Sequence, residues 1–433
     1  MPEARLGRGS HARATRRARR GDRPGVLIGK DTRISGYLLE AALEAGLSAA
    51  GVDVYLCGPL PTPGVAYLTR ALRLSAGIVI SASHNPFEDN GIKFFLGGGA
   101  KLPDDGRASR SSAGMDDAAR RACRRRSSAR RAASTTPRDA TSNSARARFR
   151  TSSTCTGWRI VVDCAHGAGV HVAPPVFHEL GAEVDRDRRR AGRHSTSTPA
   201  SARRIRNVLA EQVREHGADL GIALDGDGDR LVMADARRHA STTATSCSLR
   251  DRASTTSAAA QLAGGVVGTL MSNLGFEQAL DARRHRARAR ARRRPLRARA
   301  DAGARAGCSA ARTRATSSAS TSTRPATRIV AALAVLRALI EQKTTLAAAT
   351  RRRRAVSAAA DQRAGPRAAS TGRRTSSDPR AERRSGRGVG RRPGRVLLRP
   401  SGTEPVLRVM VEARGSRAAG RTTHAQRRAV AAR

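Results

Sequence analysis

The stretch VLIGKDTRISGYLLEAALEAGLSAAGVDVYLCGPLPTPGVAYLTRALRLSAGIVISASHNP, residues 26–86, decides the fold. Three short runs rich in β-branched residues, VLIG, VDVYLCG and AGIVIS, alternate with two Leu/Ala-rich stretches of helical length. This alternation is typical of βαβ units, which build parallel sheets covered by helices. The sequence therefore predicts an α/β sandwich in this part of the chain.

A second α/β unit is predicted further along the chain. The alternation returns in RIVVDCAHGAG (159–169), APPVFHELGAEVD (173–185) and ADLGIALDGDGDR (218–230). The length of 433 residues allows three or four domains, because a typical domain has about 100 to 150 residues.

The remaining apolar blocks differ in pattern. GGVVGTLMSNLGFEQAL (264–280) and IVAALAVLRALIEQ (329–342) are predicted to be rich in helix, whereas RVLLRPSGTEPVLRVMVEA (395–413) is predicted as strand, loop and strand.

The charge of the chain favours polyanionic partners at first sight. Lys+Arg number 82 against 35 Asp+Glu, which gives a formal net charge of +47, and so basic a chain attracts nucleic acid. The excess is concentrated in Arg/Ala/Ser/Thr tracts without periodicity, at 120–134, 283–307 and 350–388. Aromatic residues, at 2%, offer few platforms for stacking bases. An inactive Arg-rich nucleic-acid-binding remnant is therefore kept only as an alternative, and nucleic acid is not the expected partner.

The sequence also bears on location. No run is long and apolar enough to cross a membrane, and the Arg-rich N-terminus lacks the apolar region of a secretory signal. The six cysteines have no CxxC spacing, so we expect reduced thiols and no zinc site. We expect a cytoplasmic protein with no membrane partner.

Three aspartates at alternate positions, Asp225, Asp227 and Asp229, follow the strand-like run ADLGIAL. The glycines between them let a tight turn direct all three carboxylates at one point, which suits Mg²⁺ or Ca²⁺. A calcium EF-hand loop is excluded because Arg230 stands where that loop needs Gly, and Ala236 where it needs Glu. The alternative is a solvated Asp/Gly turn. Ligands of α/β sheets bind in the loops that follow strands, which favours the metal site.

A second group of polar residues follows the strand-like run GIVIS. Ser83 stands beside His84, which places a hydroxyl nucleophile next to an imidazole, and Lys93 follows the turn signal Asn90-Gly91. The alternative is an ordinary Asn-Pro turn.

The segment LLRPSGTEPVLR sets Arg399, Ser401, Gly402 and Thr403 in one loop. A guanidinium, hydroxyls and backbone N–H groups are suited to binding a phosphate dianion, although a plain Pro/Gly turn has the same composition. A nucleophile, a metal loop and a phosphate clamp together indicate phosphoryl transfer.

These segments, ISASHNP with NGIK, DGDGDR and RPSGTEP in that order, resemble the α-D-phosphohexomutases. The similarity covers 25–105, 159–185, 207–235, 262–281, 329–349 and 395–413. It implies three α/β sandwich domains and a C-terminal α+β domain, with the active site in the cleft where all four meet. The limits that we expect are 1–150 with the phosphoserine loop, 151–240 with the metal loop, 241–349 for sugar recognition and 350–433 for phosphate binding.

The resemblance also implies a role for each residue. Ser83 carries the phosphoryl group as phosphoserine, and it shares one Mg²⁺ with Asp225, Asp227 and Asp229. Lys93 matches the general acid/base, while His84 and Arg230 surround the transferring phosphate. The phosphate of a phosphosugar substrate is held by Arg399, Ser401, Gly402 and Thr403.

Within the family, GKDTRISG (29–36) and VVGTLMSN (266–273) are most similar to the bacterial branch that interconverts glucosamine 6-phosphate and glucosamine 1-phosphate. That reaction uses a phosphoserine enzyme and a bisphosphorylated sugar intermediate, and it leads towards UDP-N-acetylglucosamine and cell-wall precursors. The alternative is activity on mannose or glucose phosphates. The oligomeric state is not predicted.

The chain departs from the family pattern in two places. The N-terminal segment lacks the family's GTDGIRG-like loop, and no GE(N/Q)SGH sugar-recognition loop stands between Leu280 and Ile329. CSAARTRATSSASTSTRPAT (308–327) occupies that space, and a shifted reading frame of suitable codons gives LGGENSGHVICLDKHSTGDG, which contains the missing loop. Our hypothesis is that the Arg-rich tracts are frame-shifted segments, so that the fold is partly scrambled. Resequencing the gene and its transcript tests this.

Overall fold

The computed structural model describes the residues that carry the sheets and helices discussed below. The described residues are 24–83, 85, 88–102, 131–133, 137–147, 149, 154–186, 202–237, 240–242, 266–269, 287–290, 309–310, 318–319, 328–351, 357–364, 394–400 and 406–413. The chain divides into two compact units, one formed by 1–264 with 294–350 and the other by 265–293 with 351–433.

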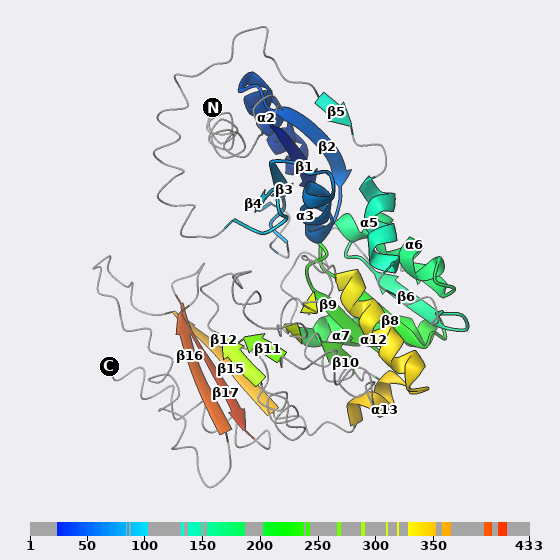
Figure 1. The fold of residues 1–433 in the computed structure, drawn as a ribbon. Helices are drawn as coiled ribbons and strands as arrows, with labels where there is room; N and C mark the ends of the chain where they lie inside the picture. Colours follow the sequence, from blue (N-terminus) through cyan, green and yellow to red (C-terminus); the bar gives the residue numbers. More distant parts are fainter. Residues whose placement is uncertain are drawn as a thin grey trace. The chain divides into compact units, whose positions relative to one another are not determined.

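The first sheet confirms the predicted βαβ alternation and adds an antiparallel strand (Figure 1). Its order is β4-β3-β1-β2-β5. β1 pairs in parallel with β2 and β3, whereas β4 runs antiparallel to β3. The elements of this region are β1 (Gly25–Lys30), α2 (Ser35–Ala49), β2 (Asp53–Pro59), α3 (Thr62–Ala71), β3 (Ala76–Ile80), β4 (Ile92–Leu96), β5 (Arg131–Ala133) and α5 (Pro137–Arg146).

Alternating apolar side chains of this sheet are buried under two helices. Val26 and Ile28 of β1 pack with Leu43 of α2, whereas Leu27, between them, packs with Val65 of α3. Successive side chains of a strand point to opposite faces, so a continuous apolar strand buries both faces of its sheet. This is the physical basis of the sandwich.

The second sheet has the order β10-β9-β8-β6-β7. β6 pairs in parallel with β7 and β8, and β9 runs antiparallel to β8. Its elements are β6 (Arg159–Asp163), the 3₁₀ helix η4 (Ala168–His171), α6 (Ala173–His178), β7 (Glu183–Arg186), α7 (Ala202–Glu215), β8 (Leu220–Leu224), β9 (Leu231–Ala234) and β10 (Ala240–Thr242).

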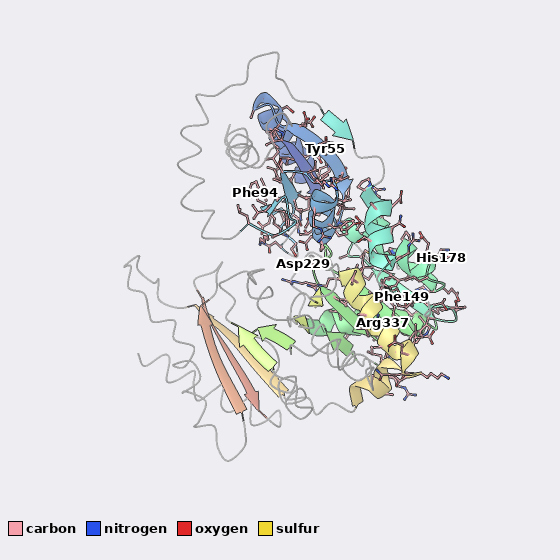
Figure 2. All side chains as sticks on the ribbon, in the orientation of Figure 1. Tyr55, Phe94, Phe149, His178, Asp229 and Arg337 are labelled. Carbon is pink, nitrogen blue, oxygen red and sulfur yellow. The ribbon has the colours of Figure 1, made fainter. Side chains whose placement is uncertain are left out.

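One continuous apolar core joins the two sheets. It contains side chains from α3, α5, α6, β6, β8 and β9, together with the apolar face of α12 (Arg328–Glu341). Phe149, Phe177 and Leu333 are buried in it, and Phe149 is labelled beside these elements in Figure 2. A short helix, α13 (Leu346–Arg351), follows α12. The predicted helix at 329–342 is thereby confirmed.

The unit that contains the C-terminus holds an antiparallel sheet of order β15-β17-β16. Its strands are β15 (Ser357–Ala364), β16 (Gly394–Pro400) and β17 (Val406–Ala413), which confirms the two strands predicted within 395–413, whereas the residues between them lie outside the described ranges. β11 (Val266–Thr269) pairs in parallel with β12 (Ala287–Arg290) in the same unit. The helix-rich prediction for 264–280 is wrong at Val266–Thr269, because this β-branched run forms a strand. In the unit formed by 1–264 with 294–350, two further short strands, β13 (Ser309–Ala310) and β14 (Ser318–Ala319), pair with each other.

Two further observations concern the residues that the structure describes. None of their helices combines the length and the apolar character that crossing a bilayer requires. Among the cysteines in these ranges, Cys57, Cys155 and Cys164 are buried. Burial raises the pKa of the Cys57 thiol to about 12, so this group stays protonated and unreactive at neutral pH.

Candidate active site

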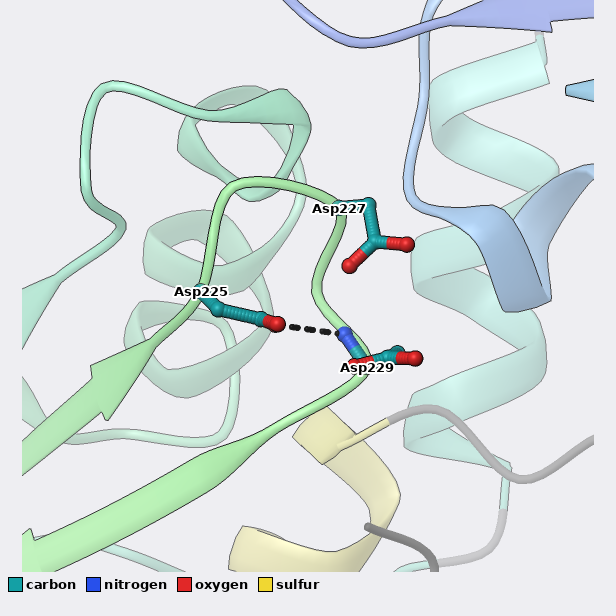
Figure 3. A group of neighbouring side chains, drawn as sticks. All are labelled: Asp225, Asp227 and Asp229. Carbon is teal, nitrogen blue, oxygen red and sulfur yellow. Dashed lines mark hydrogen bonds between the residues drawn. The ribbon is translucent and has the colours of Figure 1, made fainter. Parts of the chain in front are cut away.

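The loop between β8 and β9 carries the three aspartates at the edge of the second sheet (Figure 3). Asp225 directly follows the buried strand β8, and its Oδ1 accepts hydrogen bonds of 2.8 Å from the N–H groups of both Asp229 and Arg230. Gly228 has a φ of 66°, in the left-handed region that glycine adopts without strain. The alternating sequence thus folds into a turn that is closed by its own first carboxylate.

The turn gathers carboxylate oxygens in one place. One oxygen from each of Asp225, Asp227 and Asp229 lies within 4.8 Å of the other two. Among the described residues, buried Asp229 Oδ1 has no hydrogen-bond partner. Since a buried carboxylate oxygen normally has a partner, this atom fits a bound ion. The donor set, oxygen only and rich in charge, fits a hard divalent cation such as Mg²⁺.

The cluster is electrostatically strained without a cation. Burial, followed by the charges of Asp229 and Asp227, raises the pKa of Asp225 well above its usual value. Burial alone would raise the pKa of Asp227 too, but the charge and hydrogen bond of Lys93, with the hydroxyls of Ser83 and Thr62, hold it below its usual value. The site therefore favours positive charge beside its carboxylates.

Ser83 lies in the corresponding loop of the first sheet, between β3 and β4. Its Oγ is 2.9 Å from Asp225 Oδ2 and 2.9 Å from Asp227 Oδ1. The hydroxyl has a single proton to donate, and either carboxylate accepts it. The predicted nucleophile in the first sheet thus contacts the predicted metal loop in the second sheet.

Two cationic side chains complete the described part of the site. Lys93, on β4, forms a hydrogen-bonded ion pair with Asp227 through its Nζ and Oδ2 of the carboxylate. Arg230 Nε lies 3.7 Å from Asp225 Oδ2. The loop that carries Asp229 lies where the first and second sheets approach each other (Figure 2).

Thr62 belongs to this cluster but was not among the site residues expected from the sequence. At the start of α3, its N–H donates to the carbonyl oxygen of Asp227 at 3.0 Å, and its Oγ1 donates to Asp227 Oδ2 at 3.0 Å. The available signal was the segment PTPG directly after a strand, since loops at this edge of an α/β sheet line ligand sites.

The loop after β6 supports the metal loop from another side. Ala168 N donates to the carbonyl oxygen of Gly226 at 2.8 Å. A Cβ at Gly167 would lie 2.2 Å from that same oxygen, so only glycine permits this approach. Thr32 lies two residues after the end of β1. Its Oγ1 donates to the carbonyl oxygen of His166 at 2.7 Å.

Some predicted residues are not placed by the structure. His84, Ser401, Gly402 and Thr403 lie outside the described residues. Arg399 belongs to β16, but its side chain lies outside the description as well.

Family models match three parts of the chain. They describe the phosphoglucomutase/phosphomannomutase α/β/α domain I at residues 6–109, the α/β/α domain II at 140–238 and the C-terminal domain at 339–429. The chain belongs to the phosphoglucomutase/phosphomannomutase family. The predicted membership of the α-D-phosphohexomutases and the predicted α/β architecture are thereby confirmed.

Individual family members agree with this assignment. A phosphoglucosamine mutase of Azoarcus sp. (strain BH72) is 46% identical over 406 residues, which span 91% of this chain and 85% of that protein. The fold matches a crystal structure of a phosphoglucomutase/phosphomannomutase family protein from Burkholderia thailandensis with a TM-score of 0.75 and 20% identity, over 99% of this chain and 93% of the other. The fold is also similar to N-acetylphosphoglucosamine mutase of Aspergillus fumigatus, solved in complex with GlcNAc-6P and magnesium, with a TM-score of 0.53, 15% identity and 97% of both chains covered.

Proposed function

We propose that this chain interconverts glucosamine 6-phosphate and glucosamine 1-phosphate, the reaction of a phosphoglucosamine mutase. The observation that carries the proposal is the contact of Ser83 Oγ with Asp225 and Asp227 in a chain 46% identical to a phosphoglucosamine mutase over 91% of its length. A serine hydroxyl held against a carboxylate cluster is suited to carrying a phosphoryl group.

Ser83 is the proposed phosphoryl carrier. In the first half-reaction the P–O bond to Ser83 Oγ breaks while a bond forms from phosphorus to a sugar hydroxyl oxygen. The proton that the sugar hydroxyl loses balances the proton that Ser83 Oγ gains. The resulting sugar bisphosphate turns over in the site, and its other phosphate returns to Ser83, so that one serine serves both half-reactions.

Asp225, Asp227 and Asp229 are the proposed ligands of one Mg²⁺ ion, together with an oxygen on Ser83. Bound Mg²⁺ would offset negative charge on the transferring phosphate. The carboxylates themselves hold the loop and receive the Ser83 hydroxyl in the unphosphorylated protein. Asp229 Oδ1, buried and without a partner among the described residues, is the atom most suited to the ion.

The remaining groups have proposed roles in proton transfer and in binding. Lys93, whose Nζ reaches Asp227, would exchange the proton of the sugar hydroxyl. Arg230, on the metal loop, and His84 would lie beside the transferring phosphate. The substrate's other phosphate would be held by Arg399, Ser401, Gly402 and Thr403.

We also propose the cytoplasm as the location. Free buried thiols at Cys57 and Cys155 support a reducing compartment.

Two measurements test the proposed function. Incubating the full chain with glucose 1,6-bisphosphate should add one phosphoryl group to Ser83, detected by mass spectrometry of the protein and its peptides. A coupled assay should then show higher kcat/KM for glucosamine 6-phosphate than for mannose or glucose phosphates. Preference for mannose phosphate would reject the proposed substrate while retaining the phosphoserine chemistry, whereas no phosphate on Ser83 would reject both.

A further inference from the structure

Asp31 and Arg33 lie directly after β1, at the edge of the first sheet that also carries Ser83. Arg33 donates to Asp31 twice, from its backbone N–H to Oδ1 at 3.0 Å and from Nε to Oδ2 at 3.0 Å. Both side chains are nearly buried, at 9% and 3% exposure for Arg33 and Asp31. A buried guanidinium fixed by a carboxylate has little freedom to reorient.

The other nitrogens of the same guanidinium reach the loop that carries Ser83. Arg33 Nη2 donates to the carbonyl oxygens of Ser83 at 3.1 Å and of Asn85 at 2.9 Å, and Nη1 donates to that of Asp89 at 2.8 Å. One side chain therefore binds the backbone on both sides of the loop. The flat, forked geometry of arginine makes this possible, and a lysine ammonium cannot reproduce it.

Asp31 reaches the same loop by a second route. Ser81 Oγ donates to Asp31 Oδ2 at 2.6 Å, and Ser83 N–H donates to Ser81 Oγ at 2.9 Å. The N–H and the C=O of Ser83 are therefore both held by a network that begins at the Asp31–Arg33 pair.

The backbone of Ser83 needs this support. Its φ is 60°, in the left-handed region that residues with a Cβ rarely adopt. Such a conformation persists where surrounding contacts over-determine it, and it is concentrated at functional sites. Here it accompanies the approach of Oγ to Asp225 and Asp227 at 2.9 Å.

We infer that Arg33, anchored by Asp31, is a positioning residue that holds Ser83 in the left-handed conformation from which its Oγ receives and donates the phosphoryl group. The inference rests on the proposed function for the phosphoryl step, whereas the conformational part concerns the loop alone. Arg33 contacts backbone carbonyls of the loop, and its removal should alter the rate of the step rather than the binding of sugar or metal.

The test compares Arg33→Met, Arg33→Lys and Ser81→Ala with the parent chain. Arg159→Met is the matched control, because Arg159 also pairs with a carboxylate, Glu183, at 3.0 Å, but on the surface of the second sheet. Each full-length variant is incubated with glucose 1,6-bisphosphate and Mg²⁺, and the rate of phosphate addition to Ser83 is followed by mass spectrometry. Amide hydrogen exchange at Ser83, kcat, KM, the Kd for Mg²⁺ and the thermal unfolding temperature are measured on the same samples.

We expect Arg33→Met to slow phosphorylation of Ser83 by about a hundredfold, since a displacement near 1 Å has this effect on a reacting group. Arg33→Lys and Ser81→Ala should each slow it by about tenfold, because each keeps part of the network. KM and the Kd for Mg²⁺ should change less than about threefold, the Ser83 amide should exchange at least about tenfold faster, and Arg159→Met should match the parent.

Two results would overturn the inference. One is phosphorylation of the folded Arg33 and Ser81 variants at the parent rate, and the other is unchanged exchange of the Ser83 amide in all of them. If the parent chain takes no phosphate, the proposed function fails, and the exchange rates still decide whether Arg33 holds the loop.

Discussion

The two sheets of the first unit share one pattern of strand pairing but carry different functional groups in the equivalent turn. In each, the first strand in sequence (β1 or β6) pairs in parallel with the next strand and with the one after it, and that third strand pairs antiparallel with a fourth. The turn between third and fourth strands carries Ser83 in one sheet and the three aspartates in the other. One backbone plan thus supplies a hydroxyl once and carboxylates once, and the proposed reaction needs both.

The strand pairings show how far the likeness extends. Ile80 pairs with Ile92 in the first sheet, and Leu224 pairs with Leu231 in the second. The next residue on the fourth strand is Lys93 in one and Val232 in the other. The loops after β1 and β6 also meet, through Thr32 and the carbonyl oxygen of His166. The comparison shows that the strand pairing determines which side chains come close to one another. The residue types at these positions determine the chemistry that the side chains can perform.

The largest effect is expected from the hydroxyl side of the comparison. Ser83→Ala should abolish phosphate uptake from glucose 1,6-bisphosphate and reduce kcat by more than about ten-thousandfold, because no acceptor oxygen remains. Ser75→Ala, before the opposite end of β3, should keep full activity. A Ser83→Ala protein that still takes up phosphate, measured by mass spectrometry, would place the carrier elsewhere.

The carboxylate side should respond next. Asp227→Asn replaces a charged side chain that is 1% exposed. We expect Mg²⁺ affinity to fall by at least about tenfold, because loss of a mere hydrogen-bond partner of a metal ligand already costs about ten- to a hundredfold. Calorimetric titration measures it. Asp219→Asn, an exposed carboxylate just before β8 that accepts a bond from Arg159 N, is the control. Equal Mg²⁺ affinity in both variants would contradict the proposed metal site.

The ion pair between the two sheets should show a pH signature. Since Lys93 helps to hold the pKa of Asp227 below its usual value, the pair stabilises the fold above the unfolded carboxyl's pKa and loses this contribution as pH falls through the lower folded pKa. Lys93→Met leaves a buried charge unpaired and should cost about 3 kcal/mol at pH 7.

The pH dependence of this variant distinguishes the cause. Without Lys93, burial raises the pKa of Asp227, so acidification should protonate it and reduce the stability difference from the parent chain. Denaturant titrations at pH 7 and pH 4.5, without metal, measure this. If Lys93→Met is destabilised by the same amount at pH 7 and at pH 4.5, lost packing and not the unpaired charge is responsible for the loss of stability.

A smaller effect is expected where the loop after β6 supports the metal loop. Gly167→Ala would bring a Cβ to 2.2 Å from the Gly226 carbonyl oxygen, and such overpacking costs about 1–3 kcal/mol. Thermal unfolding and Mg²⁺ titration should both register the shift of the loop. Gly98→Ala, where no atom lies within 4 Å of the added Cβ, should leave both unchanged. Unaltered Mg²⁺ binding in Gly167→Ala would show that the contact between Gly167 and Gly226 does not affect the metal loop.

The smallest effect concerns the contact between the loops that follow β1 and β6. Thr32→Ala removes the hydrogen bond to the His166 carbonyl oxygen and should cost about 0.5–1.5 kcal/mol, whereas Thr32→Ser keeps the donor and should restore stability. Denaturant titration of both variants measures this. Equal stability of the Ala and Ser variants would show that the hydrogen bond contributes nothing.

The sequence predicted the sheets well because their signals are local. Apolar runs such as VLIG and AGIVIS need no partner to be recognised as strands. The run VVGT at Val266–Thr269 was misjudged because a short apolar segment fits a helix and a strand equally. The antiparallel strands β4 and β9 were not foreseen, since pairing direction depends on residues distant in sequence.

The candidate site was predicted in part for a similar reason. Ser83, Lys93 and the aspartates were expected in one site because a hydroxyl, an amine and clustered carboxylates each indicate a chemical role. The structure places them in contact. The Arg33 guanidinium binds backbone carbonyl oxygens of the Ser83 loop, and Thr62 binds Asp227 through its own backbone N–H as well as its hydroxyl. Such contacts depend on where the chain passes, not on the identity of the residue whose backbone is bound, so the sequence contains no comparable sign of them.

The apolar core that runs from α3 through α5 and α6 to α12 joins both halves of the site. Elements that share one core tend to open and close together as a single cooperative unit. The hydroxyl and the carboxylates are then brought together only in molecules whose common core is folded, whereas the Arg33 network acts on the conformation of Ser83 within its loop. Substitutions that create cavities in this core, for example at Leu333 or Phe177, should lower the fraction of molecules in which the site is formed. The kinetics of each molecule with a formed site should not change.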